Sequence, residues 1–98
     1  MHMLMKDKAK FFKALGDETR LKIVACLMDH EHCACEFTDI TDKDQTTNSR
    51  HLKVLVEAEI LDYRKEGRNI IYRIKNDEVK VILQNIGIER IDTCCKGC

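Results

Sequence analysis

The sequence predicts a single, mostly α-helical domain that carries one small β-hairpin. Along most of the chain, apolar residues recur at intervals of three and four, which is the pattern of amphipathic helices. One stretch, 61–74, instead alternates apolar and polar residues with a period of two, as strands do. A chain of 98 residues is one domain's worth and buries only about 60–70% of its unfolded surface. We therefore expect further stabilisation, such as dimerisation, of a domain over 1–90 that is followed by a cysteine-rich tail over 91–98.

Two amphipathic helices are expected at the start of the chain. The first carries an apolar stripe through Phe11, Phe12 and Leu15 and ends near Gly16, where a glycine can adopt the left-handed turn. Asp17 then caps a second helix. The second helix should supply core residues, namely Leu21, Ile23, Val24, Leu27 and Met28.

A short helix, a polar turn and a longer helix follow. The short helix is expected between Cys35 and Ile40, and the polar residues 41–44 read as a turn with a capping acid. The longer helix runs from about Gln45 to Ala58 and can pack its leucines inward while its polar residues stay available to a partner.

The hairpin and a last helix complete the domain. The hairpin runs from Leu61 to Ile74 with a basic tip at 66–69. Asp77 is the expected cap of the last helix, which ends near Gly87.

Charge is distributed unevenly, although lysine plus arginine equal aspartate plus glutamate at 17 each. Residues 29–44 hold six acids against one lysine, a local charge of −5, whereas residues 45–75 hold seven bases against four acids, a local charge of +3. Contact with phosphate must therefore come from the second region.

The order of these elements is that of a helix-turn-helix followed by a wing, in which the second helix enters the DNA major groove. The alternative interpretation is a solvated helix face without a partner. The candidate DNA-contacting residues are Gln45, Thr46, Thr47, Ser49, Arg50, His51 and Lys53 on the helix, and Arg64, Lys65 and Arg68 on the hairpin.

Three segments are informative together: Phe12–Ile23 (FKALGDETRLKI), Gln45–Leu55 (QTTNSRHLKVL), and Glu66-Gly67-Arg68 together with Tyr72-Arg73. They resemble the ArsR/SmtB family of metalloregulatory repressors, the arsenic-sensing type most of all. The resemblance spans about Phe11 to Ile86. It implies a winged-helix homodimer, formed by the first and last helices, that binds an operator in double-stranded DNA and dissociates on binding its inducer. A two-fold dimer predicts an inverted-repeat operator.

Six cysteines would suggest disulfides in a secreted protein, but nothing in the sequence directs export, and we expect reduced thiols and a cytoplasmic protein. No apolar run is long enough to span a membrane. Cys33-Ala34-Cys35 lies at the expected start of the third helix, where a helix N-terminus lowers a thiol pKa. By resemblance, this pair is similar to the family's Cys-Val-Cys metal site.

Two thiols are too few for a trigonal arsenite site or a tetrahedral metal site. In arsenic-sensing members of the family a third cysteine follows in the same helix, but here that position is Thr38. Cys94, Cys95 and Cys98 could complete the Cys33/Cys35 site or form one of their own.

The expected inducer is arsenite or antimonite, with cadmium, lead or zinc as alternatives. His30 and His32 flank the pair and could be zinc ligands, but we expect them to be exposed bystanders. Cys26 is expected to be a core residue. No histidine follows His51, so the last-helix zinc site of some family members is expected to be absent.

Three other functions remain open at this point. Oxidation or persulfidation of the thiols could replace metal binding in a winged-helix repressor. The module could instead bind a protein, which the neutral net charge allows. We do not expect an enzyme, because no nucleophile–base arrangement or phosphate-binding glycine loop is recognisable.

Overall fold

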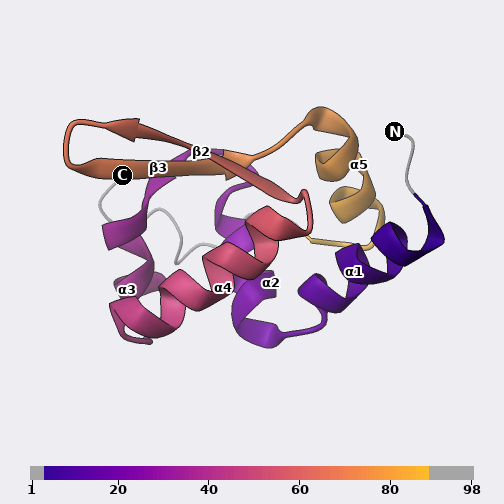
Figure 1. Ribbon diagram of the computed structural model, residues 1–98, viewed down its shortest axis with the longest axis horizontal. Coiled ribbons are helices and arrows are strands. Elements are labelled where there is room, and N and C mark those ends of the chain that lie inside the picture. The colour runs from indigo at the N-terminus through magenta and orange to yellow at the C-terminus, as the bar shows by residue number, and fades with distance from the viewer. Residues whose placement is uncertain (1–3, 89–98) are drawn as a thin grey trace.

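The computed structural model describes residues 4–88 of the chain (Figure 1). Within these residues it contains five α-helices, one short 3-10 helix and three strands. The elements are α1 (Met5–Leu15), α2 (Glu18–Cys26), β1 (His32–Cys33), the 3-10 helix η1 (Ala34–Glu36), α3 (Phe37–Thr41), α4 (Gln45–Glu57), β2 (Leu61–Glu66), β3 (Asn69–Ile74) and α5 (Asp77–Asn85). Among the residues so described, no helix is both long and apolar enough to cross a membrane.

Short polar side chains begin three of the helices. The carboxylates of Asp17 and Asp44 accept hydrogen bonds from backbone N–H groups in the first turns of α2 and α4, at 3.1 Å and 2.8 Å. The cap by Asp17 was predicted, and Asp44 is the capping acid expected among residues 41–44. At α5 the cap is Asn76, whose side-chain oxygen accepts at 3.0 Å, and not Asp77, which already lies in the helix. Asparagine and aspartate are about equally good caps, so the sequence alone did not decide between neighbours.

The two glycines at helix ends behave differently. Gly87 is left-handed, with φ of 82°, and the N–H of Ile88 bonds to the carbonyl of Leu83 at 2.9 Å, which closes α5 as predicted. Gly16 has φ of −79°. The expectation of a left-handed turn there was wrong, because the chain leaves α1 directly into the extended Asp17.

The sheet has one more strand than the sequence predicted. Its order is β1-β3-β2, with both pairings antiparallel. The predicted hairpin is confirmed as β2 and β3, and Gly67, with φ of 61°, lies in the turn between them. In the sheet, Ile71 of β3 pairs with Cys33 on one side and with Arg64 on the other. These three residues therefore form one row across the sheet.

A single hydrophobic core holds these elements together. The core residues predicted for the second helix are buried: Ile23 and Val24 lie in α2, and Leu27 and Met28 directly follow it. Leu21 packs against the core at its edge. The other buried apolar residues include Phe11, Leu15, Phe37, Leu52, Leu55, Ile60, Leu61, Val79 and Leu83. The core thus draws on every α-helix, and burial of this surface is the main force that fixes α3 and α4 against α2.

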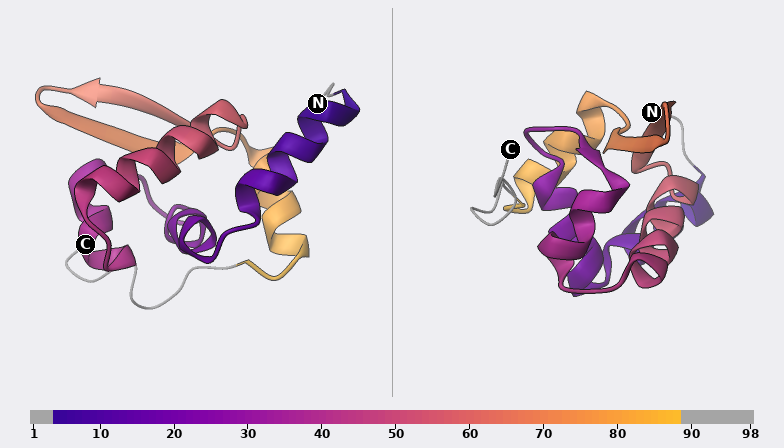
Figure 2. Two further views of the ribbon diagram at one scale, coloured as in Figure 1. Left: turned by 60° about the horizontal axis from the view of Figure 1, so that its bottom comes forward. Right: turned by 90° about the vertical axis from the view of Figure 1, so that its left-hand side faces the viewer.

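The hairpin and the two outer helices occupy opposite ends of the molecule. The β2–β3 hairpin extends beyond the body at the end where α3 lies, whereas α1 and α5 lie at the other end (Figures 1 and 2). Five of the seven large apolar side chains that are exposed in the described residues lie on or directly beside these two outer helices: Leu4, Met5, Phe12, Val81 and Ile86. The α1/α5 end therefore offers apolar surface, and the opposite end offers the hairpin and the start of α4.

Candidate nucleic-acid interface and thiol pair

The polar face of α4 is presented to solvent as predicted. Gln45, Thr46, Ser49, Arg50 and Lys53 are exposed, and Thr47 is half-buried. The opposite face buries leucines in the core. Helical periodicity thus places the polar candidates of α4 on the outer side of the domain, where a duplex could reach them.

A buried polar contact joins the two helices of the turn. Thr41 of α3 and Asn48 of α4 are both buried, and the Thr41 hydroxyl lies 2.8 Å from Oδ1 of Asn48. The amide of Asn48 also donates to the carbonyl of Lys43 at 3.3 Å. Sequence reasoning missed both residues, because the periodicity marks Asn48 only as a polar residue on an apolar face. The contact sets the angle between α3 and α4.

His51 faces the neighbouring helix, although it was predicted as a DNA-contacting residue. Its side chain is 18% exposed, and its Nδ1 lies 3.1 Å from a guanidinium nitrogen of Arg20 on α2. Arg20 also donates to the carbonyl of Ala14 at 2.5 Å. A guanidinium only donates, so Nδ1 accepts and the proton of a neutral imidazole lies on Nε2. In this position His51 ties α4 to the start of α2.

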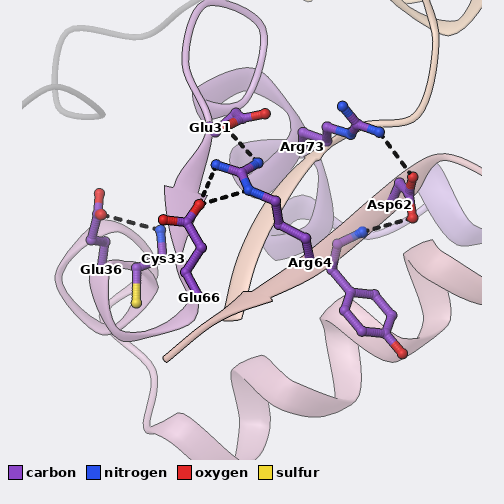
Figure 3. A network of polar contacts seen from close by, with 8 residues as sticks. Glu31, Cys33, Glu36, Asp62, Arg64, Glu66 and Arg73 are labelled. Carbon is purple, nitrogen blue, oxygen red and sulfur yellow. Dashed lines mark hydrogen bonds and ion pairs between the residues drawn. The ribbon is translucent and has the colours of Figure 1, made fainter. Parts of the chain in front are cut away.

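Arg64 on the hairpin is held between two carboxylates. Its guanidinium lies 2.8 Å from Oε1 of Glu31 and 2.6 Å from Oε2 of Glu66 (Figure 3). Hydrogen bonds to Glu31 and then Glu66 raise the pKa of Arg64 above its already high value. Lys65 and Arg68 are exposed on the same hairpin. Of the three predicted wing cations, Arg64 is therefore the one whose charge is already matched within the protein.

Two further ion pairs lie toward the base of the hairpin. Arg73 donates to Asp62 across the β2–β3 ladder at 3.3 Å, and Lys75 pairs with Glu59. The backbone N–H of Tyr63 and the Arg73 guanidinium hold the pKa of Asp62 below its usual range. Cations at the base of the hairpin are thus paired with acids, so phosphate contacts are expected nearer its tip.

The side chains of Cys33 and Cys35 lie side by side. Their Sγ atoms are 2.9 Å apart, with the Cys35 thiol donating to Cys33. Cys33 is buried and Cys35 is exposed. That hydrogen bond, followed by burial and by repulsion from Cys33 and Glu36, raises the pKa of Cys35. The expected lowering by a helix N-terminus therefore does not apply to Cys35, which shares its proton with Cys33.

The part of the chain from 4 to 88 does not by itself supply a complete metal site. In these residues no three His, Cys, Asp or Glu side chains come together in a way that could hold a metal ion. Thr38, at the position of the family's third cysteine, instead donates its hydroxyl to the carbonyl of Cys35 at 3.2 Å. Cys94, Cys95 and Cys98 lie outside the described residues, so their role as ligands stays a prediction.

His32 is not the exposed bystander that the sequence suggested. Its side chain is 1% exposed, with Nδ1 at 2.5 Å from Oε2 of Glu36 and Nε2 at 3.1 Å from the carbonyl of Cys26. It lies in β1 and packs edge-on against Phe37. The expectation failed because β1 itself was missed. His30 is exposed as expected.

The thiol pair adjoins both parts of the domain that would meet DNA. Cys33 ends β1, which pairs with β3 of the hairpin. The 3-10 helix η1 that contains Cys35 leads without a break into α3, which contacts α4 through Thr41 and Asn48. A change at the sulfurs therefore has a direct structural route to the helix and to the hairpin.

Helix α4 has a polar outer face, packs against α3 across a short turn, and is followed by an antiparallel hairpin. This arrangement defines a winged helix-turn-helix DNA-binding protein. A family model described as "Bacterial regulatory protein, arsR family" matches residues 17–63, which contain the helix-turn-helix and the thiol pair. The chain belongs to this family. It is accordingly a transcriptional regulator and not an enzyme.

Relatives of known function and a solved structure agree with this assignment. A cadmium resistance transcriptional regulatory protein, a CadC homolog of Staphylococcus aureus, is 39% identical over 93% of this chain and 76% of its own length. An arsenical resistance operon repressor of Staphylococcus xylosus is 34% identical over 98% of this chain and 90% of its own. The solution structure of a homodimeric winged helix-turn-helix DNA-binding domain of Mycobacterium bovis superposes with a TM-score of 0.80 at 27% identity, covering 84% of this chain and 76% of that one.

Proposed function

We propose that this protein is a homodimeric repressor that leaves its operator when Cys33 and Cys35 capture a soft metal or metalloid ion. The observation that carries the proposal is the 2.9 Å separation of the two Sγ atoms, since one small thiophilic ion can be held by two sulfurs so placed. The names of relatives as cadmium and arsenical resistance regulators support the same class of inducer.

On DNA, α4 would lie in the major groove and the hairpin would follow the backbone. Gln45, Thr46, Thr47 and Ser49 can donate and accept at base edges, while Arg50 and Lys53 reach phosphate or guanine. Lys65 and Arg68 would neutralise phosphates from the hairpin. His51 would act mainly by holding α4, given its contact with Arg20.

The apolar end of the molecule supports a dimer through α1 and α5. Phe12 of α1 is 58% exposed and Val81 of α5 is 53% exposed, and large apolar side chains gain free energy when a partner covers them. The similar Mycobacterium bovis domain is a homodimer. Two-fold pairing would set the two α4 helices about one helical turn of DNA apart, roughly 34–36 Å, on an inverted repeat.

For the ion, the two thiols need a third ligand. Arsenite or antimonite in trigonal geometry is the leading inducer, with cadmium, lead or zinc as alternatives. Cys94, Cys95 and Cys98 are the candidate donors, either completing this site or forming a second one. Capture of the ion requires both thiols to lose their protons, including the proton that Cys35 shares with Cys33. Coupling between such sites typically changes affinity by about 5–150-fold.

The proposal is tested by titrating reduced protein onto its promoter DNA and following fluorescence anisotropy with and without arsenite or Cd²⁺. Wild type should bind in chelator and be released by the ion. A Cys33→Ser/Cys35→Ser variant should bind the DNA but should not be released by the ion. A Cys94→Ser/Cys95→Ser/Cys98→Ser variant shows whether release also needs the tail cysteines. Failure of the reduced, chelated protein to bind any promoter fragment at low salt would overturn the proposal.

The short distance between the sulfurs also favours a redox alternative. Peroxide could accept two electrons from the two thiols, forming a disulfide and water, without any metal. Mass spectrometry distinguishes the two: a redox repressor is released by peroxide or polysulfide and gains no ion, whereas a metal sensor gains the mass of the ion while its thiols stay reduced.

A further inference from the structure

A buried imidazole lies directly behind the thiol pair. His32 is fully enclosed, and its Nε2 is 3.1 Å from the carbonyl oxygen of Cys26 at the end of α2. A carbonyl oxygen can only accept, so Nε2 carries a proton and donates it. This bond anchors β1 to α2 at the residue that immediately precedes Cys33.

The other side of the imidazole meets a carboxylate that also holds Cys33. Oε2 of Glu36 lies 2.5 Å from Nδ1 of His32, and Oε1 accepts the backbone N–H of Cys33 at 3.1 Å. Figure 3 shows Glu36 reaching back to the Cys33 amide. The carboxylate therefore bridges the two residues.

Strand pairing is the other restraint on Cys33, which lies opposite Ile71 of β3. Strand pairing alone would restrain Cys33 little, since β1 has two residues. The backbone of Cys33, and with it the place of its sulfur beside Cys35, is thus held by a chain of contacts from α2 through His32 and Glu36.

We propose that His32 and Glu36 are positioning residues for inducer capture, which keep the Cys33 sulfur within reach of the ion held by Cys35. The inference rests on the proposed function of the thiol pair and deepens it. Residues that orient metal ligands from behind typically change metal affinity by about 10–100-fold when they are removed.

The test is a titration of reduced, full-length protein with Cd²⁺ alone, followed by thiolate-to-metal charge-transfer absorbance. Glu36→Ala should weaken Cd²⁺ binding by at least about 10-fold. Glu36→Gln should fall between Ala and wild type, because an amide oxygen can still accept the Cys33 N–H but cannot bridge as an anion. His32→Gln and Glu36→Gln together should cost less than the sum of the single changes, since they remove the same bridge. Asp39→Asn, an exposed charge change on α3, is the matched control and should bind Cd²⁺ as wild type does.

All variants are compared at a temperature where circular dichroism shows each to be folded. If His32→Gln does not fold, the two Glu36 variants are sufficient to test the inference. A graded order of wild type, Gln and Ala in Cd²⁺ affinity supports the inference. Wild-type affinity in Glu36→Ala, with binding lost in Cys33→Ser, overturns it and leaves the proposed function standing. Unchanged Cd²⁺ binding in Cys33→Ser/Cys35→Ser overturns both.

Discussion

The Thr41 hydroxyl lies 2.8 Å from Oδ1 of Asn48, inside the junction of α3 and α4, and both side chains are buried. The same hydroxyl is 2.9 Å from the carbonyl of Phe37 and accepts the N–H of Lys43. A buried polar group of this kind is costly unless every partner is in place. The contact therefore favours one orientation of α4 on α3.

Replacing Asn48 with alanine should remove the buried contact that orients α4 on α3. We expect a loss of about 1–3 kcal/mol in the free energy of unfolding, because Thr41 and the Lys43 carbonyl lose a buried partner. DNA affinity should fall as well, since α4 can then tilt on α3. Urea unfolding and anisotropy measure the two effects. Lys22→Ala, an exposed change on α2, is the control, and equal stability of the two variants would contradict the prediction.

Arg50 is the predicted cation at the centre of the exposed face of α4. Arg50→Ala should weaken DNA binding by at least about 1 kcal/mol and lower the slope of log affinity against log salt by about one. Lys80→Ala on α5 removes the same charge at the end of the molecule away from α3 and the hairpin (Figure 1). An equal slope change in both variants would mean that only net charge matters.

From the proposed DNA contacts we expect Glu31 to compete with phosphate for Arg64, so removing the Glu31 carboxylate should strengthen DNA binding. The Glu31–Arg64 pair is exposed and screened by solvent, so the effect is modest: Glu31→Gln should tighten binding by up to roughly 5-fold and steepen the salt dependence. Arg64→Ala should cost more in the Glu31→Gln background than in wild type. Anisotropy titrations of the four proteins give this coupling. Asp77→Asn supplies the same change in net charge as a control, and additive effects would refute the competition.

The cap of α2 should contribute to acid sensitivity. The hydrogen bond from the backbone N–H of Arg20 lowers the pKa of Asp17 from its ordinary 3.8. Partial burial opposes this shift, and the charge of the Arg20 guanidinium adds to it. A carboxyl with a depressed folded-state pKa stabilises the fold fully above its unfolded value and loses that contribution as pH falls through the folded one.

Asp17→Asn should accordingly be less stable than wild type above about pH 4, with the difference shrinking at lower pH. Urea midpoints measured across this range, with Asp39→Asn as a second carboxylate change, test the prediction. A difference that stays constant with pH would assign the effect of Asp17 to hydrogen bonding without charge.

The helices and the hairpin could be predicted because their signals are local. Asp17 and Asp44 begin their helices, and the alternation over 61–74 belongs to one continuous hairpin. Strand β1 could not be predicted, since two residues show no alternation and their partners lie almost forty positions further along. The burial of His32 was missed for the same reason.

The candidate site was predicted in part. The positions of Cys33 and Cys35 follow from their spacing, and the exposed residues of α4 follow from the helical period. The contacts of Arg64 with Glu31 and of His51 with Arg20 join distant parts of the sequence, which no periodicity reports. The role of the tail cysteines as ligands stays a prediction from the sequence.

Cys33, Ile71 and Arg64 occupy one row across the sheet, so a disturbance at the sulfur has only two ladder steps, about 10 Å, to travel before it reaches the hairpin cation. The second structural route from the sulfurs to the proposed DNA contacts is longer and runs through η1, α3 and α4. Release from a promoter would then begin at the phosphates beneath the hairpin and reach the base edges afterwards.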